Sequence, residues 1–509
     1  MIQHTSGIHD VPESDYHGDR RSLSVSGAKV LLDCPARYKW QQDNPAHARA
    51  HTEQPICSRQ DAGRTVFSMI SLIPDYLAAT LEACPPDAHA RNADYIPELA
   101  RVDSSLFALA IATVDGMIYS AGDAEAEFTI QSVSKPFVYA MAIEDRGLDE
   151  VQRRIGVEPS GEAFNEISLE AGSKRPLNPM INAGAITAHS LVASPDDDES
   201  ARVRRIVAGL SAFAGRELSI DRTVAESEWH DAHRNLAIGH MLRSYDMLTD
   251  DPDVVVHGYV EQCAVRVTTR DLAVMATTLA NGGLHPVTGE QVVSSRTARQ
   301  VLSVMLSCGM YNAAGDWLTA VGIPAKSGVG GGIIGALPGQ VGLATFSPPL
   351  DEHGHSARGV QVFERLSEDM DMHLMDVPPP ARSVVRHSHV VPLGRGSRRV
   401  DAHVYDLQGD IRFAGAERVV RLISDEPPTT KTVVFDLVDV HALDETAARM
   451  ILETVRRLAA DGHEVWFAGL DDAPLTHGRL DDEGFDLGRG VHVRMGSDLD
   501  DVAEQIMRA

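Results

Sequence analysis

Three consecutive prolines at positions 378–380 limit what this chain can fold into more than any other feature. Proline fixes φ and has no backbone N–H, so such a run belongs neither in a helix interior nor in a central strand. It is stiff and extended, and we predict a linker over residues 371–390. With 509 residues the chain has room for two or three domains. We place a large one over 71–370 and a smaller one over 391–509, after an irregular N-terminal extension over 1–70.

The larger unit has the pattern of a single α/β domain. Two short apolar runs, 107–112 and 117–120, are separated by Asp115-Gly116, which is a hairpin signal and predicts antiparallel strands. Longer apolar runs over 137–143 and 272–279 are helix-like. We therefore expect a sheet with helices packed against it.

In the smaller unit, apolar runs alternate with amphipathic segments. Residues 402–405, 432–437 and 465–468 are predicted as strands, and 498–507 as a closing helix. Over 445–460 the apolar positions recur at helical spacing. Alternating strands and helices indicate a small α/β domain.

Charge and composition exclude several classes of function. The formal net charge of −27 repels phosphate backbones and anionic membranes, so no nucleic acid is expected as a partner. No apolar stretch approaches the roughly 20 residues of a membrane span. The first residues lack the basic start and apolar core of a secretion signal. We therefore expect a cytoplasmic protein with no membrane partner.

Neither the cysteines nor the histidines have the spacing of a metal site. The five cysteines show no CxxC pattern, which suits a reducing compartment. The 22 histidines show no HExxH pattern. The closest cluster is Asp351, His353 and His355, in a loop where histidines are usually solvated. We expect no metal and no other cofactor.

The most informative short motif is Ser-x-x-Lys, formed by Ser132 and Lys135. Positions i and i+3 share a helix face, so Lys135 can reach the Ser132 hydroxyl. A serine becomes a nucleophile when a base removes its proton, and a desolvated lysine with a lowered pKa can be that base. Ser134 is a rival nucleophile, but it is adjacent to Lys135 on a helix and does not face it. Taken alone the spacing is common by chance, and a capping serine with a solvated lysine is the alternative.

A second motif lies far downstream, where Lys326-Ser327-Gly328 is followed by further glycines. Ser-x-x-Lys with a later Lys-Ser/Thr-Gly is the pairing of β-lactamases and penicillin-binding proteins. In those enzymes the later strand lines the site, and one of its N–H groups helps to form an oxyanion hole. The two motifs together predict acyl-transfer chemistry, whereas a flexible loop is the alternative for the glycine run alone.

Over a domain-sized span of about 300 residues the chain resembles the serine-dependent glutaminase family. The resemblance is carried in order by blocks at 95–100, 131–135, 177–186, 233–235, 278–283, 307–311 and 347–351. It implies a β-lactamase-like fold, in which a mixed sheet is flanked by helices and joined by a helical lobe, with the site between them. It also implies L-glutamine as substrate, no cofactor, and a homo-oligomer, either a dimer or a tetramer.

The resemblance assigns roles to the reacting groups. Ser132 would be the acylated nucleophile and Lys135 its base. Tyr311 would lie beside them as a proton relay or second base. The backbone N–H groups of Ser132 and Val329 would form the oxyanion hole.

The same resemblance places Asn182, Glu228, Asn235 and Tyr259 at the amino-acid end of glutamine, with Tyr95 nearby. A zwitterionic substrate needs one carboxylate for its ammonium group, which suits Glu228. Neutral amide and phenol donors then satisfy the α-carboxylate.

Two segments depart from the family pattern. The residues after Glu228, Trp229-His230-Asp231, differ from the usual ones. His355 stands where the family commonly has asparagine. We expect the second difference to affect loop packing rather than chemistry.

The smaller unit resembles STAS domains of the anti-sigma-factor antagonist type through residues 433–447. Members often carry a phosphorylatable Asp-Ser-Ser/Thr-Gly turn, which here reads Asp444-Glu445-Thr446-Ala447. Glu445 would remove the switch or partly imitate its charged state, and Thr446 remains a candidate site of modification. We expect a regulatory or assembly role with a protein partner, and a purely structural domain is the alternative.

Two other functions remain open from the sequence. A β-lactam-reactive hydrolase would share both motifs, but an obvious Ser-Asp-Asn is missing. An inactive glutamine sensor acting through the STAS domain would need only the binding residues. The presence of both Ser132 and Lys135 favours an active enzyme over that sensor.

Overall fold

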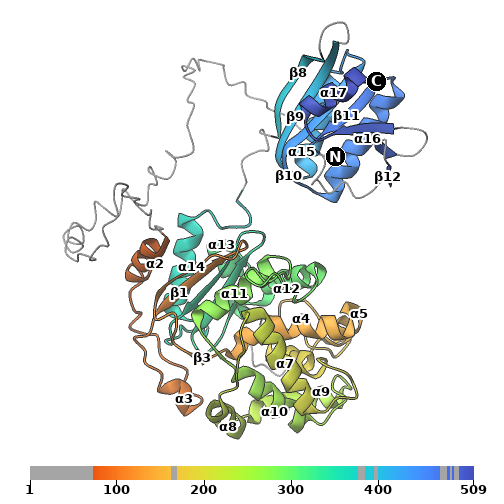
Figure 1. The fold of residues 1–509 in the computed structure, drawn as a ribbon. Helices are drawn as coiled ribbons and strands as arrows, with labels where there is room; N and C mark the ends of the chain where they lie inside the picture. The colour runs from red at the N-terminus through yellow and green to blue at the C-terminus, as the bar shows by residue number, and fades with distance from the viewer. Residues whose placement is uncertain are drawn as a thin grey trace, which may run out of the picture. The chain divides into compact units, whose positions relative to one another are not determined.

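The computed structural model describes residues 73–161, 169–376, 384–394, 399–469, 479–481, 484–486 and 492–508. The predicted N-terminal extension and the proline run of the predicted linker lie outside these residues. The chain divides into two compact units, Met1–Asp376 and Val377–Ala509 (Figure 1).

The first unit is built on a five-stranded sheet with the order β2-β1-β7-β6-β5. Its strands are β1 (Ala108–Thr113), β2 (Ile118–Gly122), β5 (Ala325–Ser327), β6 (Gly332–Leu337) and β7 (Val341–Phe346). The predicted β1–β2 hairpin is confirmed, with Ala110 opposite Ser120. All the strand pairs in this sheet are antiparallel, whereas a mixed sheet was expected. For three of the four pairs the reason is that short connections join β1 to β2, β5 to β6 and β6 to β7, and a short connection reverses the chain direction.

Helices cover both faces of this sheet. Successive side chains of a strand point to opposite faces. Accordingly, Ala110 belongs to the core formed with α11 (Thr269–Ala280), whereas its neighbour Leu109 belongs to the core formed with α2 (Ile73–Glu82) and α14 (Ala357–Asp369). Figure 1 shows α11 lying over the sheet. The expected α/β arrangement is confirmed, and the predicted helical run 272–279 lies within α11.

A lobe of helices completes the first unit. It comprises α4 (Lys135–Arg146), α5 (Leu148–Arg154), α6 (Asn182–Ser190), α7 (Glu199–Ala214), α8 (Arg222–His230), α9 (His233–Ser244) and α10 (Pro252–Cys263). α4 contacts α6, α7 and α12 (Ser295–Cys308) and is buried from Lys135 to Ile143. A helix buried on all sides has no polar face, which is why its sequence reads as a continuous apolar run.

Shorter elements connect the lobe and the sheet. They are α3 (Pro97–Ala100), β3 (Phe128–Thr129), the 3₁₀ turn η2 (Gln131–Ser134), β4 (Arg266–Val267), the 3₁₀ turn η3 (Tyr311–Ala313) and α13 (Ala314–Ala320). β3 and β4 pair with each other in a separate two-stranded sheet. Within the described ranges, no helix combines the length and apolarity that crossing a membrane requires.

The second unit contains a seven-stranded sheet with the order β12-β13-β14-β11-β10-β9-β8. Its strands are β8 (Val385–Leu393), β9 (Val400–Ile411), β10 (Thr432–Leu443), β11 (Glu464–Ala468), β12 (Arg479–Asp481), β13 (Gly484–Asp486) and β14 (His492–Gly496). The central pairs β9–β10, β10–β11 and β11–β14 are parallel, and the outer pairs are antiparallel. The predicted strands at 402–405, 432–437 and 465–468 are confirmed.

Helices cover both faces of the second sheet as well. α15 (Phe413–Asp425) and α16 (Glu445–Ala460) share a core with Val433 on one face. α17 (Leu499–Arg508) shares a core with Val434 on the other. The predicted helix 445–460 is confirmed, and the predicted closing helix is shifted by one residue. β8 begins inside the range assigned to the linker, because residues from 385 onward pair with β9.

The N-terminus of α11 is held by a capping box, and its contribution to stability can be tested. Thr268 caps the helix by accepting a hydrogen bond from the backbone N–H of Asp271, while the Asp271 carboxylate accepts one from the N–H of Thr268. Thr268→Ala should therefore lower the free energy of unfolding by about 1 kcal/mol, measured by urea denaturation of the full chain. Ser303→Ala is the control, because Ser303 is exposed within α12, and its effect should stay within about 0.5 kcal/mol. Equal effects of the two substitutions would contradict the capping role.

Candidate active site

Ser132 lies in the turn η2, which leads directly into α4. Its side chain is 7% exposed. The preceding residue, Gln131, has a φ of 49°, in the left-handed region that residues with a Cβ rarely adopt. Strained residues of this kind cluster at functional sites, where their surroundings hold them in place. The strain immediately before Ser132 therefore supports a functional role for this turn.

Lys135 begins α4, three residues after Ser132, and is 1% exposed. Its Nζ donates hydrogen bonds to Asn182 Oδ1 at 2.7 Å and to the Met180 carbonyl oxygen at 3.2 Å. Burial lowers the pKa of Lys135 to about 7. A lysine with this pKa is neutral in a large share of molecules near neutral pH, and a neutral amine can accept a proton.

A second buried lysine, Lys326 on β5, is connected to the Ser132 hydroxyl through Tyr311. Lys326 Nζ lies 2.7 Å from the Tyr311 hydroxyl oxygen and 4.0 Å from the centre of its ring. Burial, together with the charge of Lys135, lowers the pKa of Lys326 well below its usual range. Burial raises the pKa of Tyr311, and a hydrogen bond with Ser132 partly opposes that rise. Ser132, Tyr311 and Lys326 therefore form a hydrogen-bonded row.

Five residues that the sequence predicts for substrate binding fall into this region. Asn182 Nδ2 donates to Asn235 Oδ1 at 2.9 Å, which joins α6 to α9. Tyr259, on α10, is 2% exposed. Burial raises the pKa of Tyr259, and the nearby charge of Glu228 contributes to that rise. The remaining two, Glu228 and Tyr95, are linked to each other through Gln131.

Gln131 links Tyr95 to Glu228. Tyr95 donates to Gln131 Oε1 at 3.2 Å, and Gln131 Nε2 donates to Glu228 Oε2 at 3.2 Å. The Tyr95 residue as a whole is 45% exposed, but its hydroxyl end points inward, and burial raises its pKa. Glu228 is 7% exposed, and burial raises its pKa to about 7. A buried carboxylate in this position favours a cationic group beside it.

Val329 lies in the segment that follows β5 and borders the turn η2. A Cβ placed on Gly328 would lie 3.0 Å from Val133 Cγ2, and one placed on Gly330 would lie 3.0 Å from the Thr129 carbonyl oxygen. The absence of side chains on both sides of Val329 lets this backbone approach η2 closely. The approach supports a role for the segment's N–H groups near Ser132.

Three residues of the site received no role from the sequence. Gln131 directly precedes the first motif and Lys326 lies inside the second, but their partners come from segments distant in the chain. His355 is 2% exposed, and its ring lies nearly parallel to that of Tyr311 with 6.0 Å between centres. Burial lowers the pKa of His355 to about 4, so the ring is neutral. The sequence signals that pointed to His355 were its departure from the family pattern and its place in the cluster with Asp351 and His353.

No metal site emerges from the part of the chain that the structure describes. There, no group of three or more histidine, cysteine, aspartate or glutamate residues is arranged to hold an ion. The rings of His353 and His355 have 6.3 Å between their centres.

Comparison with known proteins identifies the two units. The glutaminase family model matches residues 90–375, and the STAS domain model matches residues 397–487. A glutaminase of Corynebacterium efficiens is 48% identical over 401 residues, which cover 79% of this chain and 93% of that protein. A glutaminase of Trichormus variabilis is 51% identical over 284 residues, which cover 56% of this chain and 84% of that protein.

Solved structures give the same result. A crystal structure of Mglu covers 78% of this chain and 98% of that chain at 50% identity, with a TM-score of 0.72. A structure of Mglu in its glutamate form matches at 46% identity with a TM-score of 0.71 and the same coverage. The family model spans more than half of the chain, and the chain belongs to the glutaminase family. Its second unit is a STAS domain.

The buried environment of Lys135 predicts a specific titration. In protein labelled with ¹³C at the lysine Cε atoms, the Lys135 signal should titrate with a pKa of about 7, as ammonium below that pH and amine above it. The signal is assigned by its loss in Lys135→Met. In urea the same lysine should titrate near its ordinary value of roughly 10.4. A Lys135 signal that titrates alike in folded and unfolded protein would contradict the desolvated site.

Proposed function

We propose that this protein hydrolyses L-glutamine to L-glutamate and ammonia through an ester formed on Ser132. Membership of the glutaminase family supports the reaction. The single observation that carries the mechanism is the buried Lys135, whose pKa of about 7 fits a base three residues from a serine hydroxyl.

In the first half of the reaction Lys135 removes the proton of Ser132. A neutral amine has two N–H donors, which match the two acceptors Asn182 Oδ1 and Met180 O, and a lone pair that accepts the serine proton. The Ser132 oxygen attacks the side-chain amide carbon of glutamine. The bond from that carbon to nitrogen then breaks, and ammonia leaves after gaining a proton. Tyr311, backed by Lys326, is within hydrogen-bond reach of Ser132 and can relay that proton.

In the second half a water molecule attacks the ester carbon. A base accepts the proton of the water, the bond to the Ser132 oxygen breaks, and that oxygen recovers its proton. Glutamate is released and the site returns to its starting state. The N–H groups of Ser132 and Val329 stabilise the negative oxygen that forms in both halves, a contribution of roughly 3 kcal/mol per donor in comparable sites.

Glu228 holds the ammonium group of glutamine, and the amides and phenols around it hold the α-carboxylate. Glu228 is a carboxylate buried within the binding region, with Gln131 as its hydrogen-bond donor. Asn182, Asn235, Tyr259 and Tyr95 supply neutral polar groups. This division of charges matches a zwitterionic amino acid.

The STAS domain provides docking for a protein partner or assembly of the enzyme. Asp444 caps α16 by accepting a hydrogen bond from Ala447 N at 2.7 Å. Thr446 is exposed in the first turn, where the helix dipole favours added negative charge. The enzyme would act in the cytoplasm, as its sequence pattern led us to expect, and as a homo-oligomer, as the family resemblance implies.

Ser132→Ala tests the nucleophile. The native protein should release ammonia and glutamate in equal amounts over many turnovers, and the variant should lower kcat by at least about a thousand-fold. Ser303→Ala, on the exposed face of α12, is the control and should retain activity within about two-fold. If the native protein binds glutamine and releases nothing, the enzyme is excluded and the glutamine sensor takes its place. Turnover of nitrocefin instead would favour the β-lactam hydrolase.

Glu228→Gln tests substrate recognition. The variant should raise KM for glutamine by about ten-fold or more, because the ammonium group loses its carboxylate, while kcat falls less. In the native protein kcat/KM should rise as pH increases through about 7, where Lys135 and Glu228 both lose protons. Initial rates between pH 6 and 8 measure both effects. An unchanged KM would rule out Glu228 as the ammonium site.

A further inference from the structure

A chain of buried hydrogen bonds begins at the proposed nucleophile turn η2 and runs to α10 and α6. Ser134 Oγ donates to the Gln131 carbonyl oxygen at 2.8 Å. Gln262 Nε2, on α10, lies 2.9 Å from Ser134 Oγ, and Gln262 Oε1 lies 2.9 Å from Nδ1 of His189, on α6. Ser134, Gln262 and His189 are each at most 1% exposed. The chain therefore joins η2, α10 and α6 without contact with water.

The donor and acceptor roles along this chain are fixed by counting protons. The one hydroxyl proton of Ser134 is used on the Gln131 carbonyl, so Ser134 Oγ must accept the proton that comes from Gln262. The Gln262 amide then turns its oxygen towards His189, which must donate from Nδ1. His189 Nδ1 therefore carries a proton.

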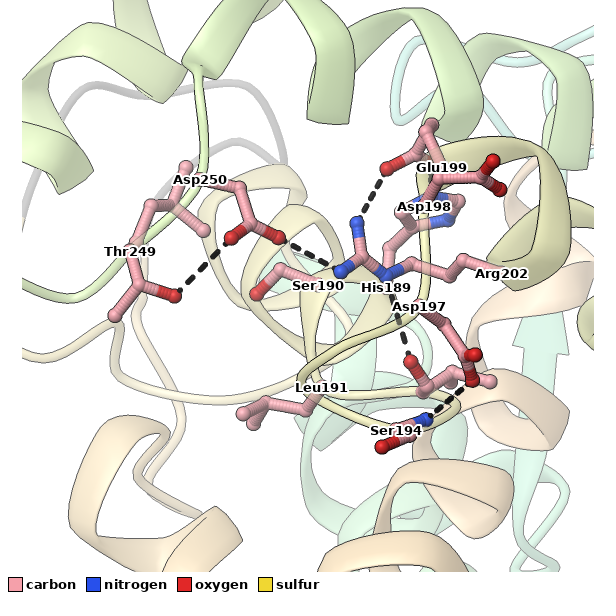
Figure 2. Close-up of polar contacts among 12 residues, drawn as sticks. His189, Ser190, Leu191, Ser194, Asp197, Asp198, Glu199, Arg202, Thr249 and Asp250 are labelled. Atoms are coloured by element: carbon pink, nitrogen blue, oxygen red, sulfur yellow. Dashed lines mark hydrogen bonds and ion pairs between the residues drawn. The ribbon is translucent and has the colours of Figure 1, made fainter.

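The other nitrogen of His189 faces a carboxylate. His189 Nε2 lies 2.6 Å from Glu199 Oε1. The second oxygen of Glu199 accepts a hydrogen bond from Arg202, whose guanidinium also donates to Asp250 Oδ2 at 2.7 Å. Figure 2 shows Arg202 between these two acidic side chains. A guanidinium contact keeps a carboxylate ionised, so Nε2 must carry a proton as well.

The packing around His189 is built to hold this pair. A Cβ on Gly258, in α10, would lie 1.8 Å from Glu199 Oε1 and 2.8 Å from His189 Nε2, so only a residue without a side chain lets α10 approach. The next residue, Tyr259, presents its ring at nearly a right angle to His189, with 6.5 Å between centres. Among the described residues, the charged and titratable groups with a recorded contact to His189 are Glu199, with Arg202 behind it on α7, and Tyr259 on α10.

We propose that His189, as an imidazolium held between Gln262 and Glu199, is a positioning residue for the Ser132 nucleophile. It fixes Gln262, which fixes Ser134, which in turn anchors the carbonyl of the strained Gln131. This role rests on the function proposed above, since it concerns the placement of that nucleophile. Residues with a Cβ in the left-handed region cost about 1–3 kcal/mol and persist only where neighbouring contacts hold them.

Kinetics of paired variants test the positioning role. His189→Phe and Gln262→Met preserve side-chain bulk but break the chain, and each should lower kcat by about ten- to a hundred-fold with KM changed less than about three-fold. The double variant should be no slower than the slower single variant, because both substitutions break the same chain. Thr187→Val is the matched control, since Thr187 is equally buried on α6 but bonds only within its helix, to the Ala183 carbonyl. Losses that multiply in the double variant, or an equal loss in Thr187→Val, would overturn the proposal.

The protonation state of His189 can be measured without any activity. In protein labelled with ¹⁵N in histidine, both ring nitrogens of His189 should show the chemical shifts of proton-bearing nitrogens. The short hydrogen bond of 2.6 Å between His189 and Glu199 should also give a strongly downfield N–H signal in the proton spectrum of the full chain. The signal should disappear in His189→Phe and in Glu199→Gln. Its absence from the folded native protein, or a His189 ring nitrogen that carries no proton, would overturn the imidazolium assignment. A native protein that shows this signal but releases no ammonia would instead reject the proposed function, so the two failures are distinguishable.

Discussion

The rest of the catalytic unit depends on one constraint, the loss of water around the two buried lysines, Lys135 and Lys326, near the Ser132 hydroxyl. Lowering the pKa of Lys135 from 10.5 to about 7 represents on the order of 5 kcal/mol of lost stabilisation of the charged form. Only a tightly packed interior can impose such a penalty. α4 supplies it by lying between α6, α7 and α12, while β5 brings Lys326 from the sheet. The lobe and the sheet thus each contribute one buried lysine to the same site.

The geometry at that meeting point is held by strained backbone and by hydrogen bonds that compensate for it. Gln131 and Tyr311 both have positive φ, at 49° and 53°. The side chain of Gln131 joins Tyr95 to Glu228, and its carbonyl is anchored by Ser134. Contacts in three directions therefore fix one residue, which is how strain at a functional turn is maintained.

Burial also sets the electrostatic balance of the site. It lowers the pKa of Lys135 and raises that of Glu228, in both cases to about 7. Each group is disfavoured in its charged form for the same physical reason, the loss of water. In the proposed reaction, a zwitterionic amino acid brings a positive group that favours the charged form of Glu228, whereas Lys135 acts in its neutral form.

The sequence by itself predicted several elements, the α/β class of both domains and the proposed pair of Ser132 and Lys135. The Asp-Gly hairpin, the helix at 445–460 and the family blocks depend on local pattern, which a linear chain carries in full. Only the tertiary structure decided what Lys326, Gln131 and His189 contact, because their partners Tyr311, Glu228 and Glu199 belong to other elements. It also decided that the first sheet is antiparallel throughout and that β8 begins at Val385. Long-range pairing and burial depend on which surfaces meet in space, and spacing along the chain does not encode them directly.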